Sequence, residues 1–188
     1  MKAEISTVIV ASFLVAAGAG AQTGPDDRTA MNTIYAEGLG AGGAYALNYE
    51  RMLSNDFGVR VGFSYLSVTA TSSNGTTTAS SGGSFIAIPI TASYVGISSG
   101  SHALELGAGV TIWDISVSGT SGGFVGAATG FVPVGTAIVG YRFQPREGGF
   151  NFRVGASPLF GKGLGLNANN PTAFGVFPWG YLSFGWTF

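Results

Sequence analysis

The last eleven residues of the chain, 178–188, alternate apolar and small side chains up to the final position. The apolar positions are Leu182, Phe184, Trp186 and Phe188, with Ser183, Gly185 and Thr187 between them. In a β-strand this alternation gives one apolar face and one polar face. Such a strand suits a barrel that crosses a membrane, where one face meets lipid and the other meets the lumen.

The overall hydropathy supports a membrane location. Of the 188 residues, 46% are hydrophobic and 9% are charged, and the mean hydropathy is +0.37. Beyond the N-terminal segment, however, no apolar run approaches the roughly 20 residues that a spanning helix needs. Because a lipid bilayer offers no hydrogen-bond partners, only helices and closed barrels can cross it. The sequence therefore predicts a transmembrane β-barrel.

The N-terminal segment, residues 1–21, has the parts of a secretory signal peptide. Lys2 supplies the positive charge, residues 8–17 are apolar, and residues 19–21 form a small-x-small cleavage site. We expect cleavage before Gln22. The alternative is a retained anchor helix, which the short apolar stretch disfavours.

The remainder is expected to be one domain, with a polar lead-in at residues 22–32 and the barrel at residues 33–188. The chain contains no cysteine. Disulfide bonds are therefore impossible, and no cysteine is present to carry a lipoprotein anchor.

Eight alternating segments predict an all-β fold, an eight-stranded antiparallel up-and-down transmembrane β-barrel. The expected short turns are residues 54–56, 96–101 and 145–149, and the expected long loops are residues 71–84, 116–130 and 162–175. Small outer-membrane barrels keep their periplasmic turns short and their extracellular loops long. The first strand, near residues 34–40, is the weakest, because the connection that follows it is short on the side of the long loops.

Charged residues within the strands share the less apolar parity, except Arg51 at a strand end. Those predicted to face the lumen are Glu37, Glu50, Arg60, Glu105, Arg142 and Arg153. Side chains of the opposite parity, such as Ile88 and Leu106, are predicted to face outward. A soluble barrel has the reverse arrangement, with its apolar face inward, and so is disfavoured.

The three acids and three bases of this interior cluster are expected to pair, because an eight-stranded barrel is filled by side chains and unpaired buried charge is costly. Glu50 and Arg60 fall opposite each other across the turn near residue 55, which predicts a cross-strand ion pair. Glu105 is expected to meet Arg142. The cluster favours a structural plug, and the alternative is a path for protons or ions.

Several short motifs carry a resemblance to a known family. They are residues 46–51, 58–62, 102–107, 140–145 and 152–159. In this order and spacing they resemble a family of small outer-membrane β-barrel proteins of the OmpA and OmpX kind, over residues 34–188. The resemblance implies a small barrel in the Gram-negative outer membrane, with no established catalytic activity.

The sequence gives little support for catalysis, metal binding or nucleic-acid binding. His102 is the single histidine and sits at a turn, so it has neither a catalytic partner nor further ligands for a metal. The formal net charge of −1 provides no basic surface for nucleic acid. We therefore expect no enzymatic activity, no cofactor, no metal site and no nucleic-acid partner.

The expected function is a structural or surface-interaction role in the cell outer membrane, with a lumen plugged by side chains. The alternative is a narrow porin-like channel for ions or small solutes. The expected partners are outer-membrane lipid and the barrel-assembly machinery. That machinery would read the C-terminal residues Leu182, Phe184, Trp186 and Phe188, which resemble its signal. The uncharged long loops suit contact with an unidentified surface ligand.

Overall fold

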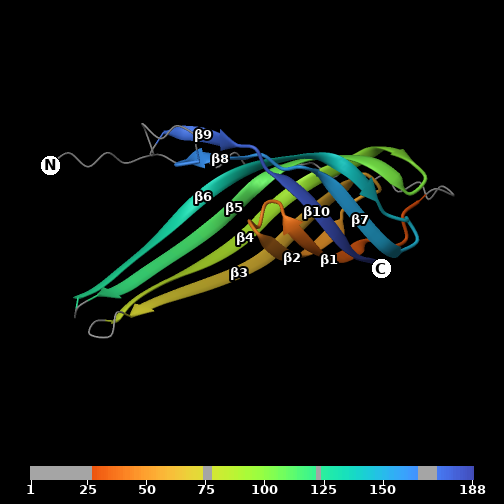
Figure 1. Ribbon diagram of the computed structural model, residues 1–188. Helices are drawn as coiled ribbons and strands as arrows, with labels where there is room; N and C mark the ends of the chain where they lie inside the picture. Colours follow the sequence, from red (N-terminus) through yellow and green to blue (C-terminus); the bar gives the residue numbers. More distant parts are fainter. Residues whose placement is uncertain (1–26, 74–77, 122–123, 165–172) are drawn as a thin grey trace.

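The computed structural model describes residues 27–73, 78–121, 124–164 and 173–188 (Figure 1). The predicted signal peptide, residues 1–21, lies outside the described residues. Within the described residues, no helix has the length and hydropathy needed to cross a membrane.

The described part of the chain contains ten strands. They are β1 (Asn32–Leu39), β2 (Tyr45–Met52), β3 (Phe57–Ser73), β4 (Thr78–Ser99), β5 (His102–Ser121), β6 (Phe124–Phe143), β7 (Gly149–Ala156), β8 (Leu159–Lys162), β9 (Phe174–Phe177) and β10 (Gly180–Thr187). β8 continues β7 along the edge of β6, and β9 pairs with β8 before the chain enters β10. Breaks that contain Pro158 and Pro178 separate these pairs of strands. Because proline cannot donate a ladder hydrogen bond, it interrupts a paired strand.

All neighbouring strands are antiparallel, and they close into a barrel. β1 pairs with β2 on one side and with β10 on the other, and β5 pairs with both β4 and β6. The ring therefore runs β1, β2, β3, β4, β5, β6, β7 and β10 and returns to β1. The predicted eight-stranded antiparallel β-barrel is confirmed.

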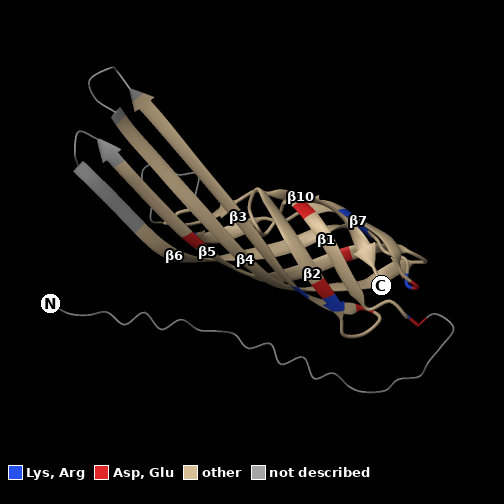
Figure 2. Cartoon of the chain, turned by 90° about the horizontal axis from the view of Figure 1, so that it is seen from below, with Lys and Arg blue, Asp and Glu red and all other residues tan. Residues whose placement is uncertain are grey.

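The strands differ greatly in length. β1, β2, β7 and β10 have 8 residues each, whereas β3 to β6 have between 17 and 22. The long strands extend past the mouth of the barrel as a four-stranded sheet (Figures 1 and 2). We call this the protruding sheet, and it comprises residues 64–73, 78–87, 113–121 and 124–132. The end of the barrel that bears this sheet is called the distal end, and the opposite end, which holds the C-terminus, is called the terminal end.

The long loops predicted at residues 71–84 and 116–130 are largely wrong. The β3–β4 ladder continues to the pair Ser73 and Thr78, and the β5–β6 ladder continues to Ser121 and Phe124. Their Ser, Thr and Gly composition suggested loops, yet threonine also suits strands and pairing in the ladders gives backbone groups hydrogen-bond partners.

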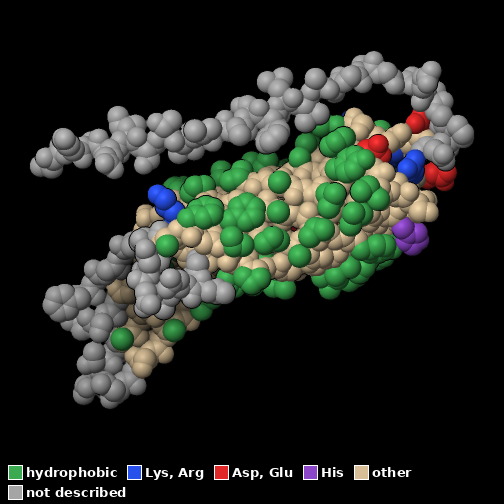
Figure 3. All heavy atoms as spheres, turned by 90° about the horizontal axis from the view of Figure 1, so that it is seen from above, with side chains coloured by type: hydrophobic (Ala, Val, Ile, Leu, Met, Phe, Trp, Pro, Cys, Tyr) green, Lys and Arg blue, Asp and Glu red, His purple; other side chains and the backbone are tan. Residues whose placement is uncertain are grey.

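The two faces of the barrel wall agree with the predicted parity. Ile88 and Leu106 are 37% and 38% exposed on the outside, whereas Arg60 and Arg153 are 5% and 0% exposed. Hydrophobic side chains cover the visible outer face, and acidic and histidine side chains gather at one end (Figure 3). The barrel is therefore apolar outside and polar inside.

The barrel wall is closed between β1 and the C-terminus, and one turn fills the distal mouth. At the terminal end, Asn32 and Phe188 exchange two backbone hydrogen bonds of 2.7 and 2.8 Å. At the distal end, the β1–β2 turn, residues 40–44, folds into the mouth. Ala41 is fully buried there, and its carbonyl oxygen accepts a 2.9 Å hydrogen bond from Thr111 Oγ1 of β5.

Candidate functional site: a charged barrel interior

The six charged residues predicted to face the lumen all lie inside the barrel, and none is more than 5% exposed. They come from six different strands. Glu37 lies on β1, Glu50 on β2, Arg60 on β3, Glu105 on β5, Arg142 on β6 and Arg153 on β7. Each lies on the inward face of its own strand, so all six side chains point toward the barrel axis.

Glu50 is the centre of this cluster. Its two carboxylate oxygens accept from the Arg142 guanidinium, Nη1 to Oε1 at 2.9 Å and Nη2 to Oε2 at 2.7 Å. Arg153 also donates to Glu50 Oε2, and Ser93 Oγ donates to Oε1 at 3.2 Å. An arginine and a carboxylate joined by two parallel hydrogen bonds form one of the stronger kinds of ion pair. This contact therefore fixes β2 and β6 relative to each other.

Glu105 is a second acceptor for the same two arginines. Its Oε1 lies 3.5 Å from Arg142 Nη1 and 3.3 Å from Arg153 Nη1, and its Oε2 accepts from the Tyr181 hydroxyl at 3.2 Å. The expected contact between Glu105 and Arg142 is therefore present. Two carboxylates and two guanidiniums form one continuous network.

The predicted ion pair between Glu50 and Arg60 is wrong. The two residues are in register across β2 and β3, as expected. The Arg60 side chain instead contacts Glu37 Oε2 at 3.0 Å and donates to the Tyr35 hydroxyl and Thr91 Oγ1, each at 2.7 Å. In so narrow a lumen a long side chain reaches other strands as easily as its direct neighbour, so register alone does not determine the partner.

Tyr35 joins the two halves of the network, and the sequence reasoning did not identify it. Its hydroxyl accepts from Arg60 and from Arg153, and the Arg153 guanidinium lies 4.1 Å from its ring centroid. A cation over an aromatic face is attracted to the ring. The available signal was parity, because Tyr35 shares the inward face of β1 with Glu37.

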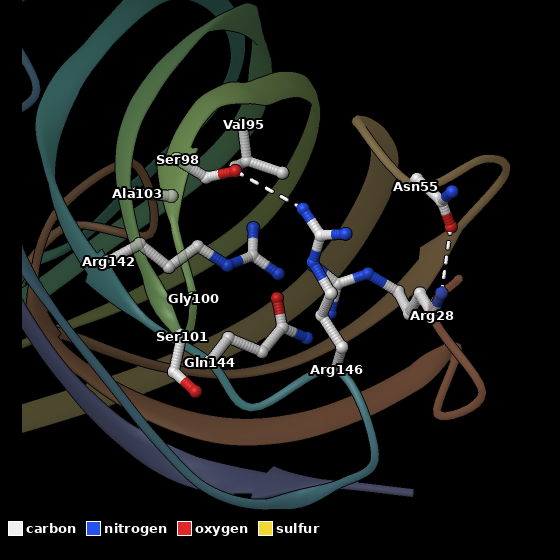
Figure 4. Close-up of a pocket in the computed structure, with 10 residues that line it drawn as sticks. All are labelled: Arg28, Asn55, Val95, Ser98, Gly100, Ser101, Ala103, Arg142, Gln144 and Arg146. Carbon is white, nitrogen blue, oxygen red and sulfur yellow. Dashed lines mark hydrogen bonds between the residues drawn. The ribbon is translucent and has the colours of Figure 1, made fainter. Parts of the chain in front are cut away.

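Arg28 adds a further buried cation that the sequence reasoning also missed. It precedes β1 and is 7% exposed, and its backbone N–H donates to Asn55 Oδ1 at 2.9 Å. Figure 4 shows its side chain converging with those of Arg142 and Arg146 at the terminal end. Burial, and secondarily the charge of Arg142, lower the pKa of Arg28 to about 10.

The cavity among these arginines is small. Its volume is about 10 Å³, and Gln144 and Ser98 also line it. That space holds at most one water molecule, so it cannot admit phosphate or a larger anion. This end of the lumen is packed with side chains.

The arrangement provides little for catalysis within the described residues. No group of acids and histidines there could hold a metal ion. His102 Nδ1 lies 2.6 Å from the Tyr141 hydroxyl on the outer surface, whereas Glu105 of the same strand faces the interior. Glu37 Oε1 is the one interior carboxylate oxygen without a partner among the described residues.

No known family model matches this chain, and no curated protein matches it. Its fold is similar to that of Ail, the attachment invasion locus protein of Yersinia pestis, in a crystal structure with the heparin analogue sucrose octasulfate. The two chains are 14% identical, the match covers 84% of this chain and 95% of Ail, and the TM-score is 0.50. A second Ail crystal structure has the same identity and coverage with a TM-score of 0.45. The first likeness is one of fold, a small eight-stranded barrel.

Proposed function

We propose that this chain is an integral outer-membrane β-barrel protein that makes contacts at the cell surface through its protruding sheet, without enzymatic activity. Its apolar outer wall supports a lipid environment, because only a bilayer makes such a face favourable. The likeness to the Ail barrel agrees with this location. In this orientation the terminal end faces the periplasm and the protruding sheet faces outward.

The observation that carries this proposal is the unpaired edge of β3. β2 pairs with β3 only as far as Phe63, so Ser64 to Ser73 have a neighbour on one side alone. This edge has no charged residue and no proline. Natural edge strands are usually protected by such residues, since a bare edge invites another strand to pair with it.

The chemistry of the sheet points to an uncharged partner. Ail was crystallised with a sulfated heparin analogue, but this chain has no lysine or arginine between positions 61 and 141. Asp114 is the one charged residue of the protruding sheet. A polyanion would find no cations there, whereas an extended peptide could add to the β3 edge through backbone hydrogen bonds.

Attachment of cells that produce the protein, to each other or to cultured epithelial cells, tests this proposal. Val68, Gly83 and Val117 form one row across β3, β4 and β5. Val68→Lys puts a charge on the edge strand, and Val117→Lys puts the same charge on a central strand of that row. We expect the first variant to lose most attachment and the second to retain it.

Several results would contradict the contact role. One is attachment by producing cells no greater than by a strain without the protein. Another is equal behaviour of the two lysine variants. Heat-modifiable mobility on gels establishes that each variant has formed its barrel.

We further propose that the lumen is closed to solutes. In support, the Glu50 and Arg142 side chains bridge opposite strands, and the β1–β2 turn occupies the distal mouth. Purified protein in planar bilayers is expected to give no single-channel steps. Stable steps would favour the alternative function, a narrow porin-like channel for ions or small solutes.

The proposed partners of the folded chain are outer-membrane lipid and, during insertion, the barrel-assembly machinery. The exposed residues Leu182, Phe184, Trp186 and Phe188 face outward on and just after β10, at the strand that closes the barrel against β1. No nucleic-acid partner is proposed, because the chain lacks a basic surface.

A further inference from the structure

The distal mouth contains an apolar cavity that none of the interior charges line. Its volume is about 480 Å³, within the range of pockets that bind small molecules. Its walls come from five strands and the break before β10, and its main side chains are Leu66, Phe85, Trp113, Leu159, Phe177 and Trp179. Apolar side chains from segments far apart in the sequence thus converge on one space.

The floor of the cavity is built by the β1–β2 turn. Leu39 lies there with a φ of 61°, a left-handed conformation that residues other than glycine seldom adopt. Gly43, at φ 89°, approaches so closely that a Cβ would lie 3.1 Å from the Phe85 ring. The turn therefore separates the cavity from the ion-pair network, and at position 43 it leaves little room for a side chain.

Two unpaired donors mark the cavity as a binding site. The indole nitrogens of Trp113 and Trp179 are buried, and neither has a hydrogen-bond partner in the described part of the chain. Each indole is held by an aromatic neighbour, Phe85 and Phe177 respectively, with ring centroids 5.4 Å apart in both pairs. A buried N–H normally has an acceptor, so two unpaired indoles among the residues that line one apolar cavity point to a ligand that supplies oxygen.

We propose that this cavity binds a single acyl chain, with the chain against the apolar wall and the ester or acid carbonyl oxygen accepting from the Trp113 and Trp179 indoles. No charged side chain lines the cavity, which excludes a ligand whose binding needs an ion pair. The apolar wall requires a hydrocarbon body, and the two donors require an oxygen acceptor. An acyl chain with its carbonyl is the simplest molecule with both.

The topology also indicates where the ligand enters. Among the described residues, β9 and the extended part of β3 each pair with a strand on one side alone, so we infer that the ligand enters between them, above β1 and β2. Given the proposed membrane location, this entrance lies beside the lipid surface. The acyl chain could therefore come from a bilayer lipid or from a free monoacyl molecule.

Tryptophan fluorescence provides a direct test, because the chain has only three tryptophans. Trp186 is 61% exposed at the terminal end, so Trp186→Phe leaves only the two cavity indoles as reporters. The protein is placed in phosphatidylcholine nanodiscs with a tryptophan-free scaffold and titrated with methyl 2-bromododecanoate, whose bromine lies next to the carbonyl and quenches on contact. We expect saturable quenching at about one ester per protein.

Leu66 and Val68 provide a matched pair of variants on the same face of β3. Leu66 lines the cavity and Val68 does not. Leu66→Arg should abolish the saturable quenching and Val68→Arg should retain it, with Ala44→Arg as a second cavity variant if Leu66→Arg fails to fold. Quenching that rises linearly with the ester, equally in all variants, would overturn the proposal.

A second comparison tests the carbonyl contact. The hydrocarbon 1-bromododecane should bind about tenfold more weakly than the ester, as expected when two buried donors stay unpaired. Trp113→Phe removes one N–H and keeps Trp179 as reporter, so it should reduce that difference. Equal affinities of ester and hydrocarbon for the Trp186→Phe protein would overturn the proposal as stated.

Nanodiscs made with brominated phosphatidylcholine distinguish the two sources. Quenching that depends on Leu66 without added ester identifies a bilayer lipid as the occupant, and quenching by the added ester alone identifies a free acyl molecule. Absence of Leu66-dependent quenching in both arms would contradict the proposal. None of these results depends on cell attachment, so the surface-contact role can fail separately.

Discussion

Glu50 on β2 and Arg142 on β6 form a two-bond ion pair, at 2.7 and 2.9 Å, across the full width of the barrel. Four steps along the ring separate β2 from β6 in either direction, so the two strands lie on opposite walls. Both side chains are fully buried. The pair therefore couples strands that share no backbone hydrogen bond.

Arg142→Met should lower the free energy of unfolding by about 3–5 kcal/mol, because it leaves buried carboxylate without its main partner. The measurement is the urea dependence of gel mobility in a refolding detergent. The double variant Glu50→Gln with Arg142→Met keeps the interior charge unchanged and should recover most of that loss. An exposed control, Arg51→Met, should change stability by less than about 0.5 kcal/mol.

Arg28→Met should be neutral or stabilising, in contrast to Arg142→Met. Two nitrogens of Arg28, Nε and Nη1, are buried without a partner among the described residues. Its lowered pKa means that the charged form is disfavoured in the folded state relative to the unfolded state. The gain from Arg28→Met is therefore fully present below pH about 10 and shrinks as the pH rises further, toward the ordinary pKa of an arginine. A loss of stability above about 1 kcal/mol at neutral pH would contradict this reading.

Gly155→Ala should destabilise the barrel wall by about 1–3 kcal/mol, as overpacking does. A Cβ at Gly155 would lie 2.6 Å from Gly140 Cα and 2.9 Å from Tyr181 Cε1. The inward-facing Tyr181 ring occupies the space that the glycines leave, which positions its hydroxyl on Glu105. Gly130→Ala on β6 is the control, since nothing lies within 4 Å of its added Cβ. Equal urea midpoints for the two variants would count against this packing.

Phe188→Ser should slow insertion into the outer membrane of cells while leaving refolding in detergent unchanged. The reason is that Phe188 pairs with Asn32 only through backbone atoms, and its ring is 55% exposed. Its side chain is thus available to the assembly machinery and contributes little to packing. Phe150→Ser removes a ring with 48% exposure on the neighbouring strand and should not slow insertion. The rate of insertion is measured by pulse-chase labelling, as the appearance of heat-modifiable protein. Equal insertion rates for the two variants would exclude a signal at the C-terminus.

The alternation of side chains was enough to predict the barrel and which side chains face its interior. Ile88 outside and Arg153 inside follow directly from a period of two, because a strand buried on one face fixes its parity strongly. The strand ends were less predictable. Residues 78–84 and 116–121 consist largely of serine, threonine and glycine, and only pairing with their neighbours makes them strands.

The partners within the interior could not be read from register. Glu50 and Arg60 are directly opposite, yet Arg60 turns to Glu37 while Glu50 bonds across the axis to Arg142. Cross-strand rules describe neighbours on one sheet, whereas closure brings every strand within reach of every other. Arg28 lies outside the strands, where no periodicity marks a buried residue.

The apolar cavity was also invisible to period analysis, because each strand contributes only one or two side chains to it. A signal was nevertheless present. Trp113 pairs with Ala87, two residues along β4 from Phe85, and it has the same parity as Glu105 and Thr111 on β5. A large aromatic on an otherwise polar inner face is a departure from the pattern of a filled, polar lumen.

The inward-folded turn at residues 40–44 divides the interior into two compartments. One holds the ion-pair network, and the other is the apolar cavity at the distal mouth. Substitutions above this partition can alter what the mouth accepts without disturbing the ionic scaffold beneath it. The stability of the barrel and the chemistry of its mouth are thus set by separate residues.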